Sequence, residues 1–335
     1  MKVLVTGGSG YIGSHTCLEL LRAGHEVQVV DSLYNGSAEA LKRIKRLTNR
    51  NLGFQKCDVR DAQELAAVFL KFQPDAVIHL AGLKAVGESI SEPARYYDVN
   101  VGGTAVLLSA MEKTGCDNIV FSSSATVYGK PKYLPCDENH PLDPINPYGR
   151  TKLMGENLLR DWAITKKIRR AVALRYFNPV GADTSGDIGE DSKNVPNNLM
   201  PFIAQVAVGQ RSCLQVFGND YDTIDGTGVR DYIHVVDLAL AHIAAVEQMV
   251  TLEQFEVINI GTGIGLSVLQ MLQEFEKESG KIVKYEIVPR RLGDAPAVWA
   301  DASKAASKLS FQAKRGVTEM CRDTWLWQSA NPSGY

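Results

Sequence analysis

The sequence predicts an α/β fold with a doubly wound parallel sheet and a second, smaller α/β domain. Short apolar runs alternate with amphipathic stretches through the first half of the chain, which is typical of parallel strands joined by crossover helices. A glycine-rich turn directly follows the first apolar run, as in Rossmann-type nucleotide-binding sheets. The second half is less regular, with two long polar stretches between shorter patterned segments.

Hydrophobic periodicity assigns the elements of the first half. We expect strands at 2–6, 26–31, 54–57, 76–80, 118–122 and 171–175. We expect helices at 11–23, 61–72, 94–113 and 147–166, and Gly24 is placed to end the first of them. The order of these elements indicates right-handed crossovers and one large parallel sheet.

The second half predicts a smaller domain whose chain returns once to the first. Ranges 181–201 and 218–228 are rich in turn-forming residues and read as loops, 202–208 and 235–249 as helices, and 256–260 as a buried strand. We therefore expect a dinucleotide-binding domain at 1–180, joined by 235–262. Ranges 181–234 and 263–335 form the second domain.

Composition excludes several classes of protein. The 335 residues include 36 Lys plus Arg and 38 Asp plus Glu, so the chain lacks the cationic surplus of a general nucleic-acid binder. We find no apolar run long enough to span a membrane and no histidine spacing typical of a metal site. Six scattered cysteines without a Cys-x-x-Cys pair indicate reduced thiols and a cytoplasmic location.

The glycine-rich turn predicts a dinucleotide site. Gly7, Gly10 and Gly13 enclose Tyr11 and Ile12 between the first strand and the first helix, where main-chain N–H groups and a helix N-terminus can face a pyrophosphate. Asp31 ends the second strand, and its carboxylate suits ribose hydroxyls and repels a 2′-phosphate. No Lys or Arg occurs at 32–40, so NAD is favoured over NADP. The alternative is a glycine turn needed only for packing.

Two further loops follow strands and are expected in the same crevice. The first holds Asp58 and Val59, and Asp58 could contact adenine or instead cap the helix that follows. The second is 80–84, whose expected cofactor contacts are Leu80, Ala81, Gly82 and Lys84. Lys84 could bind phosphate or be a solvated loop lysine.

Tyr148 and Lys152 are the candidate catalytic pair. They lie four residues apart at the start of a predicted helix, so they share one face. A free tyrosine has a pKa of about 10, and a nearby ammonium together with a positively charged nicotinamide would lower it. Ser124 lies 24 residues before Tyr148 at the end of the fifth strand and could share a substrate proton. A surface helix pair is the alternative.

These motifs resemble the extended short-chain dehydrogenase/reductases and, among them, the C4 epimerases of UDP-hexoses. The matching segments span nearly the whole chain: 5–15, 79–89, 121–129, 175–182, 196–201, 217–235 and 290–304. The resemblance implies reversible epimerisation at C4 through a transient 4-keto sugar with tightly bound NAD. It also implies a homodimer formed through the helices at 94–113 and 147–166, and a UDP-sugar site in the second domain.

The resemblance also assigns roles to residues. Tyr148 is the base and acid at the sugar 4-hydroxyl, Ser124 assists it, and Lys152 tunes Tyr148 and holds NAD. Further NAD contacts are Asn35, Ser122 and Phe177, although Phe177 could equally be a core residue.

The substrate contacts are assigned in the same way. Arg230 and Arg291 would bind the pyrophosphate, which suits the forked guanidinium, but either could be tied up in a structural ion pair, Arg230 with Asp231 or Asp294. The remaining expected sugar and nucleotide contacts are Asn178, Asn198, Leu199, Phe217, Asp294 and Val298.

Two positions depart from the pattern of these epimerases. Val99 stands where Asn is frequent near NAD, while Asn100 is retained, and we interpret Asn100 as structural. Val298 stands where many bacterial relatives have Tyr beside the C2 substituent of the sugar. The smaller Val predicts room for an N-acetyl group and some activity on UDP-N-acetylhexosamines.

Two alternatives remain open. A nucleotide-sugar 4,6-dehydratase would use the same fold, but those enzymes have Asp-Glu immediately before Val-Tyr-Gly, where this chain has Ala125 and Thr126. A non-enzymatic NAD-sensing protein is the second, and such proteins tend to lose the Tyr or the Lys that this chain retains.

Overall fold

The computed structural model describes residues 1–191, 196, 198–291 and 293–335, and its centre is a sheet of seven parallel strands. The strand order is β10-β6-β5-β4-β1-β2-β3. The bounds are β1 (Lys2–Thr6), β2 (Glu26–Asp31), β3 (Leu52–Lys56), β4 (Ala76–His79), β5 (Asn118–Ser124), β6 (Arg170–Tyr176) and β10 (Phe255–Ile260). Strands β2 and β3 are added on one side of β1, and β4, β5 and β6 are added on the other side. This change of side between β1 and β4 is typical of doubly wound folds. The predicted fold class is confirmed.

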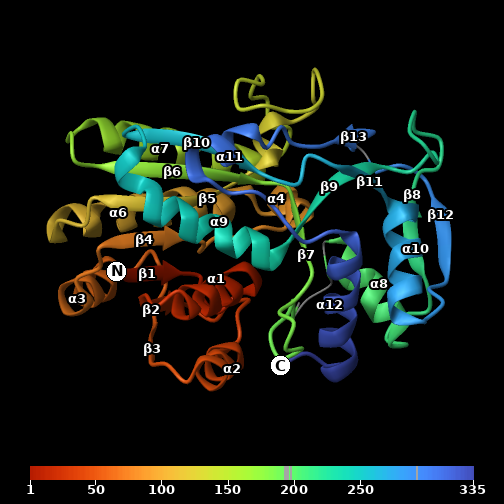
Figure 1. Ribbon diagram of the computed structural model, residues 1–335. Coiled ribbons are helices and arrows are strands. Elements are labelled where there is room, and N and C mark those ends of the chain that lie inside the picture. Colours follow the sequence, from red (N-terminus) through yellow and green to blue (C-terminus); the bar gives the residue numbers. More distant parts are fainter. Residues whose placement is uncertain (192–195, 197, 292) are drawn as a thin grey trace.

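Helices cover both faces of this sheet (Figure 1). One face packs against α1 (Tyr11–Arg22), α2 (Ala38–Thr48), α9 (Val235–Gln248) and α11 (Ser303–Leu309). The other packs against α3 (Ala62–Phe72), α6 (Gly103–Thr114) and α7 (Pro147–Ile164). Strand residues therefore alternate between two apolar clusters, with Val120 in the first and Phe121 in the second.

Three local predictions differ from the structure. Helix α2 was not expected, although Ser37 caps it and Leu41 and Ile44 are buried one turn apart. Strand β5 extends beyond the expected range 118–122 and ends at Ser124, the residue expected at the strand end, because it stays paired with β6. The single helix expected at 94–113 is instead α5 (Pro93–Tyr96), a π-helical turn (Tyr97–Gly102) and α6, preceded by α4 (Val86–Ser91).

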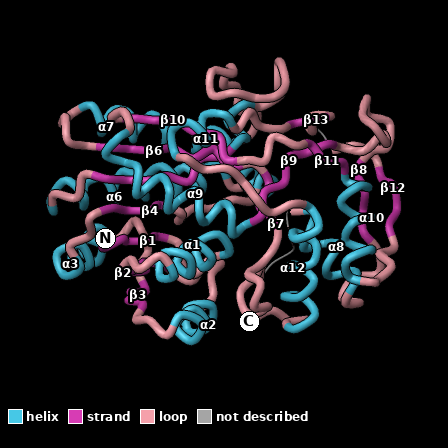
Figure 2. The backbone as a smooth tube through the Cα atoms, viewed as in Figure 1, coloured by secondary structure: helices cyan, strands magenta, loops and turns pink. Residues whose placement is uncertain are grey.

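A second region of smaller sheets lies beside the carboxyl ends of the large sheet (Figures 1 and 2). It contains β7 (Asn178–Val180), β9 (Val229–His234), β11 (Gly265–Ser267) and β13 (Ala297–Val298) in one sheet, and β8 (Leu214–Phe217) with β12 (Tyr285–Val288) in another. Helices α8 (Leu199–Ala207), α10 (Val268–Ser279) and α12 (Val317–Ala330) enclose an apolar cluster between them. Single 3-10 turns occur at Ala125–Tyr128 and Met249–Thr251.

The chain crosses between the two regions more often than we expected. Strand β10 and helix α9 return to the large sheet, as the sequence indicates. Helix α11 also returns, since Ala305 and Leu309 join the core cluster of α1 and α9. Range 263–335 therefore does not belong wholly to the second region.

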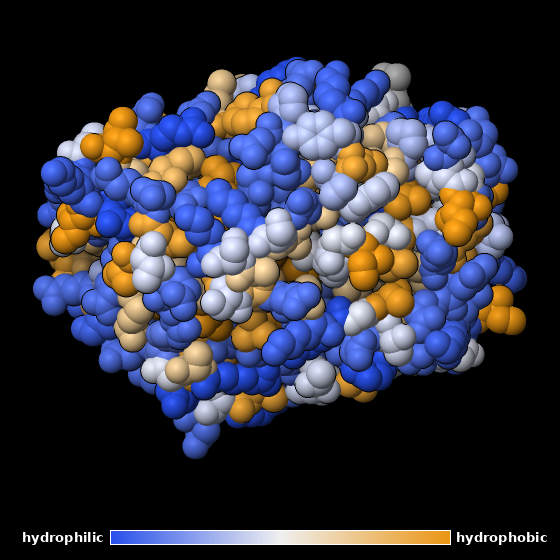
Figure 3. Space-filling model, turned by 45° about the horizontal axis from the view of Figure 1, so that its top comes forward, coloured by the Kyte–Doolittle hydropathy of each residue, from blue (hydrophilic) through white to orange (hydrophobic). Residues whose placement is uncertain are grey.

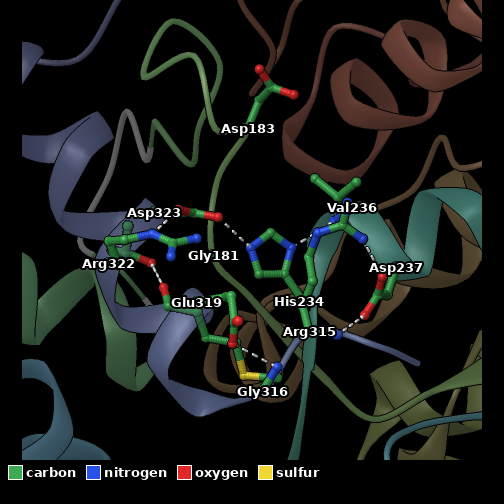
Figure 4. A network of polar contacts seen from close by, with 12 residues as sticks. Gly181, Asp183, His234, Val236, Asp237, Arg315, Gly316, Glu319, Arg322 and Asp323 are labelled. Atoms are coloured by element: carbon green, nitrogen blue, oxygen red, sulfur yellow. Dashed lines mark hydrogen bonds and ion pairs between the residues drawn. The ribbon is translucent and has the colours of Figure 1, made fainter. Parts of the chain in front are cut away.

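A buried histidine joins the two regions where β9 becomes α9 (Figure 4). His234 Nδ1 accepts from the main-chain N–H of Val236 at 3.1 Å, and Nε2 lies 3.2 Å from Asp323 Oδ2 on α12. Asp323 also accepts from Arg322 at 2.9 Å. Gly181 passes the imidazole so closely that a Cβ would lie 2.7 Å from it, and its φ of +93° suits glycine. These contacts link α12 to the junction of β9 and α9.

The surface in Figure 3 is mostly hydrophilic, with apolar side chains in small separate groups. Among the described residues, no helix is long and apolar enough to cross a membrane.

Candidate functional site

A cavity of about 1110 Å³ opens at the carboxyl ends of the parallel strands, between the large sheet and the second region. Its wall contains most of the residues singled out from the sequence: Gly7, Gly10, Tyr11, Ile12, Gly13, Asp31, Asn35, Asp58, Val59, Leu80, Ala81, Gly82, Lys84, Ser122, Ser124, Tyr148, Lys152, Phe177, Asn178, Asn198, Arg291 and Asp294. Leu199, Phe217, Arg230 and Val298 are not among its described wall residues.

The glycine turn has the shape that a pyrophosphate requires. A Cβ on Gly13 would lie 2.1 Å from the carbonyl oxygen of Gly7, and one on Gly7 would lie 2.6 Å from the Ala81 nitrogen, so the fold needs both glycines. A Cβ on Gly10 would meet only Gly7 O at 3.4 Å. Packing alone does not demand glycine at position 10, which lies in the cavity wall at the start of α1. A closely approaching anion would demand it.

Asp31 is held in a fixed orientation at the end of β2. Its two carboxylate oxygens accept main-chain N–H bonds from Ser9 at 3.0 Å and from Leu33 at 2.8 Å. The carboxylate lies in the cavity wall and is nearly buried. A carboxylate so placed suits ribose hydroxyls and disfavours a 2′-phosphate, so the residues present fit NAD.

The loop after β4 is braced by a buried amide. Asn100 Oδ1 accepts from Leu83 N at 2.8 Å, and Nδ2 donates to Leu83 O at 3.1 Å and Thr151 Oγ1 at 3.0 Å. The structural role expected for Asn100 agrees with these contacts. The Lys84 ammonium pairs with the Glu190 carboxylate at 3.0 Å.

Asp58 does not cap the following helix. Asp61 caps α3 by accepting from Gln63 N and Glu64 N, so that alternative for Asp58 is wrong. The Asp58 carboxylate pairs with Arg60 Nη2 at 2.7 Å, and the Arg60 guanidinium holds the pKa of Asp58 below its usual value. Both residues lie in the cavity wall.

Tyr148 lies at the first turn of α7, where Asn146 caps the helix. Burial raises the pKa of Tyr148, and a hydrogen bond with Ser124 opposes that rise. Ser124 Oγ already accepts from Thr126 N at 3.2 Å and from Thr126 Oγ1 at 3.0 Å. Its own proton is therefore available to the Tyr148 oxygen or to a ligand.

Lys152 lies one turn along the same helix face. Its Nζ donates to Ser122 O at 2.6 Å and to Ser122 Oγ at 2.9 Å, and lies 5.8 Å from the centre of the Tyr148 ring. Burial lowers the pKa of Lys152 to about 8. In the protein alone, burial is the largest influence on Tyr148 and raises its pKa. The lowering expected from Lys152 together with a bound nicotinamide stays a prediction.

Phe177 has the buried position of a core residue and also reaches the cavity wall, so its contact with NAD stays a prediction. It belongs to a buried cluster with Val127, Tyr128 and Cys136, and it also lines the cavity next to Asn178.

The far end of the cavity is formed by side chains of the second region. Arg291 lines the wall, and its guanidinium lies 3.8 Å from the centre of the Phe217 ring. Phe217 thus supports Arg291 from behind. Arg230 Nη2 lies 3.9 Å from Asp294 Oδ1 and Nη1 donates to Val229 O at 2.8 Å. One expected alternative for Arg230, an ion pair with Asp294, is present as a long contact; Asp231 instead accepts from Thr262, Gly263 and Ala300.

Val298 and Leu199 pack against apolar clusters next to the cavity lining. Val298 pairs with Arg230 in β13 and β9 and packs against the cluster that contains Phe177. Leu199 begins α8 and packs on the core of the second region.

Several wall residues were missed by the sequence analysis. Tyr176 and Thr126 could have been found, since each lies within two residues of a strand end already singled out. Glu190 lies in an irregular loop and becomes part of the wall through Lys84 and Asn198. The Arg95 guanidinium lies 4.8 Å from the centre of the Tyr34 ring, and both residues line the cavity. No local pattern marks these last three.

Comparisons with known proteins agree with the geometry. The family model described as GDP-mannose 4,6 dehydratase matches residues 4–324. A curated UDP-glucose 4-epimerase from Bacillus subtilis is 55% identical over 335 residues, covering 100% of this chain and 99% of that protein.

Two solved structures are similarly close. The UDP-glucose 4-epimerase of Stenotrophomonas maltophila, with bound NAD and formylated UDP-arabinopyranose, has a TM-score of 0.97 at 50% identity and covers 99% of each chain. That of Bifidobacterium longum, with NAD+ and UDP, has a TM-score of 0.96 at 48% identity and covers 100% of each.

Proposed function

The chain belongs to the UDP-glucose 4-epimerase family, and we propose from this premise how its cavity works. The protein interconverts UDP-galactose and UDP-glucose at C4, with NAD as cofactor. One observation carries the proposal: a single cavity joins the glycine turn and Asp31, the Tyr148–Ser124 pair, and Arg291. Dinucleotide, sugar and nucleotide diphosphate can thus be bound side by side.

The cofactor half of the cavity lies on the large sheet. The turn formed by Gly7, Gly10 and Gly13 would hold the pyrophosphate, and Asp31 would hold the adenosine ribose. Bound NAD supplies a hydride acceptor and returns the hydride to the same carbon. Asn35, Asp58 and Lys84 complete this half.

The proton at the sugar 4-hydroxyl is handled by Tyr148. Tyr148 takes this proton when C4 is oxidised and returns it when C4 is reduced. Ser124 donates to the Tyr148 oxygen and holds it toward the sugar. Lys152 donates toward the cofactor ribose and adds a positive charge that favours the phenolate.

The nucleotide is held from the opposite side. Arg291 and Arg230 bind the pyrophosphate, with Phe217 behind Arg291, while Asn178, Asn198 and Asp294 line the sugar and nucleotide positions. Holding the nucleotide lets the 4-keto sugar turn within the cavity and present its other face.

One assay tests this function. Purified protein is incubated with UDP-galactose without added NAD, and UDP-glucose is measured. We expect conversion, because NAD is regenerated in each cycle and stays bound. Accumulation of a 4-keto-6-deoxy sugar would instead favour a dehydratase, although Ala125 and Thr126 provide no carboxylate for that elimination. No conversion, with NAD bound, would refute the proposal.

A second substrate class follows from Val298. Val298 is not among the described wall residues, but it packs against the cluster that contains the wall residue Phe177. Because its side chain is smaller than Tyr and has no hydroxyl, we propose that a UDP-N-acetylhexosamine is also accepted. The variant Val298→Tyr should lose this activity while retaining that on UDP-galactose. Wild-type protein with no detectable turnover of UDP-N-acetylglucosamine at saturating concentration would contradict the idea.

We also propose a homodimer in the cytoplasm. Helix α7, one of the two helices expected at the interface, carries the exposed apolar side chains Met154 and Ile164, and all six cysteines are free thiols. Light scattering coupled to gel filtration would show a monomer mass if the dimer is wrong.

A further inference from the structure

A row of buried hydrogen bonds leads from Lys152 away from the cavity. Lys152 Nζ donates to Ser122 O at 2.6 Å and to Ser122 Oγ at 2.9 Å. The Ser122 hydroxyl is a partner of the Tyr176 phenol and opposes the burial that raises the pKa of that phenol. The phenol is also hydrogen-bonded to His242 Nε2. His242 Nδ1 lies 2.8 Å from the carbonyl oxygen of Leu238.

This row passes from one face of the large sheet to the other. Lys152 comes from α7, and the cluster beneath α7 contains Phe121. Ser122 follows Phe121 on β5 and so points to the opposite face, where Tyr176 of β6 and the residues of α9 form the other cluster. His242 is on α9, completely buried, and not among the described residues of the cavity wall.

The chemistry of the last carbonyl sets the direction of every bond in the row. A carbonyl only accepts, so His242 Nδ1 carries a proton and donates to Leu238. Burial lowers the pKa of His242 to about 4, so the ring is neutral and Nε2 is an acceptor. Tyr176 must then donate to His242, which leaves its oxygen to accept from Ser122. The Ser122 proton is then directed to Tyr176, and the lone pairs of the Ser122 oxygen accept from Lys152.

We propose that His242 is a positioning residue which, through Tyr176 and Ser122, makes Ser122 a permanent acceptor for Lys152. Two of the three ammonium protons are thereby directed into the protein, and the third is directed to the cavity beside Tyr148. This inference rests on the proposed function, in which Lys152 acts as a charged donor.

The other groups that face Lys152 do not stabilise its ammonium as Ser122 does. Tyr148 on α7 and His79 on β4 face it, and burial lowers the pKa of His79 to about 3, so that ring is neutral. The Phe121 ring lies 5.1 Å away. The nearest carboxylate on the same helix face, Glu156, is paired with Arg175 at 2.7 Å.

The test removes the acceptor at the end of the row. In His242→Phe, the Tyr176 hydroxyl has only Ser122 left to donate to, and the Ser122 proton turns toward Lys152. The pKa of Lys152 then falls, and the alkaline limb of the kcat–pH profile moves about one unit to lower pH. Tyr176→Phe should give the same shift, and the double variant no more than the larger single one. His242→Gln, which retains an acceptor and a donor, should restore the wild-type profile.

A second readout does not depend on turnover. The NAD affinity of each variant is measured against pH by equilibrium dialysis, and its alkaline decline should move by the same amount. Tyr128→Phe is the matched control, because Tyr128 is equally buried and its hydroxyl bonds Asn259 at 2.6 Å without touching Lys152 or Ser122. It should leave both profiles in place.

The outcomes separate the two proposals. Wild-type protein that binds NAD but converts no UDP-galactose defeats the proposed function. Active wild-type protein with profiles that coincide for wild type, His242→Phe and Tyr176→Phe defeats the present inference. If His242→Phe does not fold, Tyr176→Phe, which removes one oxygen atom, decides.

Discussion

The cofactor half and the nucleotide half of the cavity are built differently. The cofactor half consists of main chain and buried side chains at the ends of parallel strands, where Gly7 and Gly13 leave no space for a Cβ and Asp31 and Lys152 are nearly buried. The nucleotide half consists of long side chains from the second region. There Arg291 is exposed and rests on Phe217.

This difference matches the residence times that the reaction requires. A cofactor that is regenerated in every cycle can stay in a rigid cradle, which costs little ordering on binding. A substrate that leaves after every cycle needs contacts that open and close. Long arginine side chains, one stacked on a ring and one in a 3.9 Å contact with Asp294, can do so.

The largest expected effect is at the point where the halves meet. Tyr148→Phe removes the group that exchanges the sugar proton, and kcat should fall by about 10²–10⁴-fold. The NAD content of the purified protein should not change, because Tyr148 does not form the glycine turn or the Asp31 contact. Turnover with UDP-galactose and absorbance of released NAD measure the two effects. A variant that retains most of its turnover would show that another residue is the base.

A pair of glycine substitutions tests the rigidity of the cofactor half. Gly13→Ala places a Cβ 2.1 Å from Gly7 O, and the strain should lower the free energy of unfolding by about 1–3 kcal/mol and abolish NAD retention. Gly10→Ala meets nothing closer than 3.4 Å, so it should fold with wild-type stability and still bind NAD more weakly. Urea unfolding and calorimetric NAD titration distinguish these results. Equal NAD affinity in Gly10→Ala and wild type would mean that the pyrophosphate lies elsewhere.

Removing a guanidinium tests the nucleotide half. Arg291→Ala should raise KM for UDP-galactose roughly 10- to 100-fold, the effect of a lost charged hydrogen bond, and leave NAD content unchanged. Its neighbour Arg290 is the matched control, because Arg290 Nε pairs with Asp220 at 2.6 Å and Arg290 is not among the described wall residues. Steady-state kinetics should show little change in KM for Arg290→Ala. Similar KM values for both variants would show that Arg291 does not bind the substrate.

The smallest effect is on stability and concerns the buried ammonium. The pKa of Lys152 is about 8 in the folded protein against 10.5 for the free group. The folded state therefore favours the neutral amine, and this contribution to stability is lost as pH falls from 10.5 to about 8. Lys152→Met should be inactive yet more stable than wild type, because it removes a buried charge. The gain should be only about 1 kcal/mol at pH 7, since the hydrogen bond to Ser122 O is lost at the same time.

The gain of Lys152→Met should shrink as pH rises above 8. Urea unfolding at pH 7 and pH 9.5 measures it. A gain that is constant between these two pH values would contradict the depressed pKa.

Much of the cofactor half could be predicted from the sequence because its signals are local. Glycine spacing, the acidic residue after the second strand and the Tyr148–Lys152 spacing each lie within one βα unit. The missed helix α2 also has local signals, with Ser37 as its cap and Leu41 and Ile44 on one face. The π-helical turn lacked such a signal. It coincides with the Asn100 side chain bonding to Leu83 and Thr151, two partners from other elements.

The nucleotide half was anticipated only through resemblance to known epimerases. Phe217 and Arg291 are 74 positions apart and come together because β8 and β12 pair. Glu190 reaches Lys84 across 106 positions. Side chains separated in this way carry no spacing that periodicity can detect.

The amino-acid sequence by itself determined the doubly wound sheet, the glycine turn and the helix face shared by Tyr148 and Lys152, because hydrophobic periodicity and helix geometry act over a few residues. Only the tertiary structure decided where Arg230 and Arg291 lie, that Lys152 donates to Ser122, and that α11 returns to the large sheet. Those outcomes depend on which elements pack together, and packing is set by the burial of apolar surface over the whole chain.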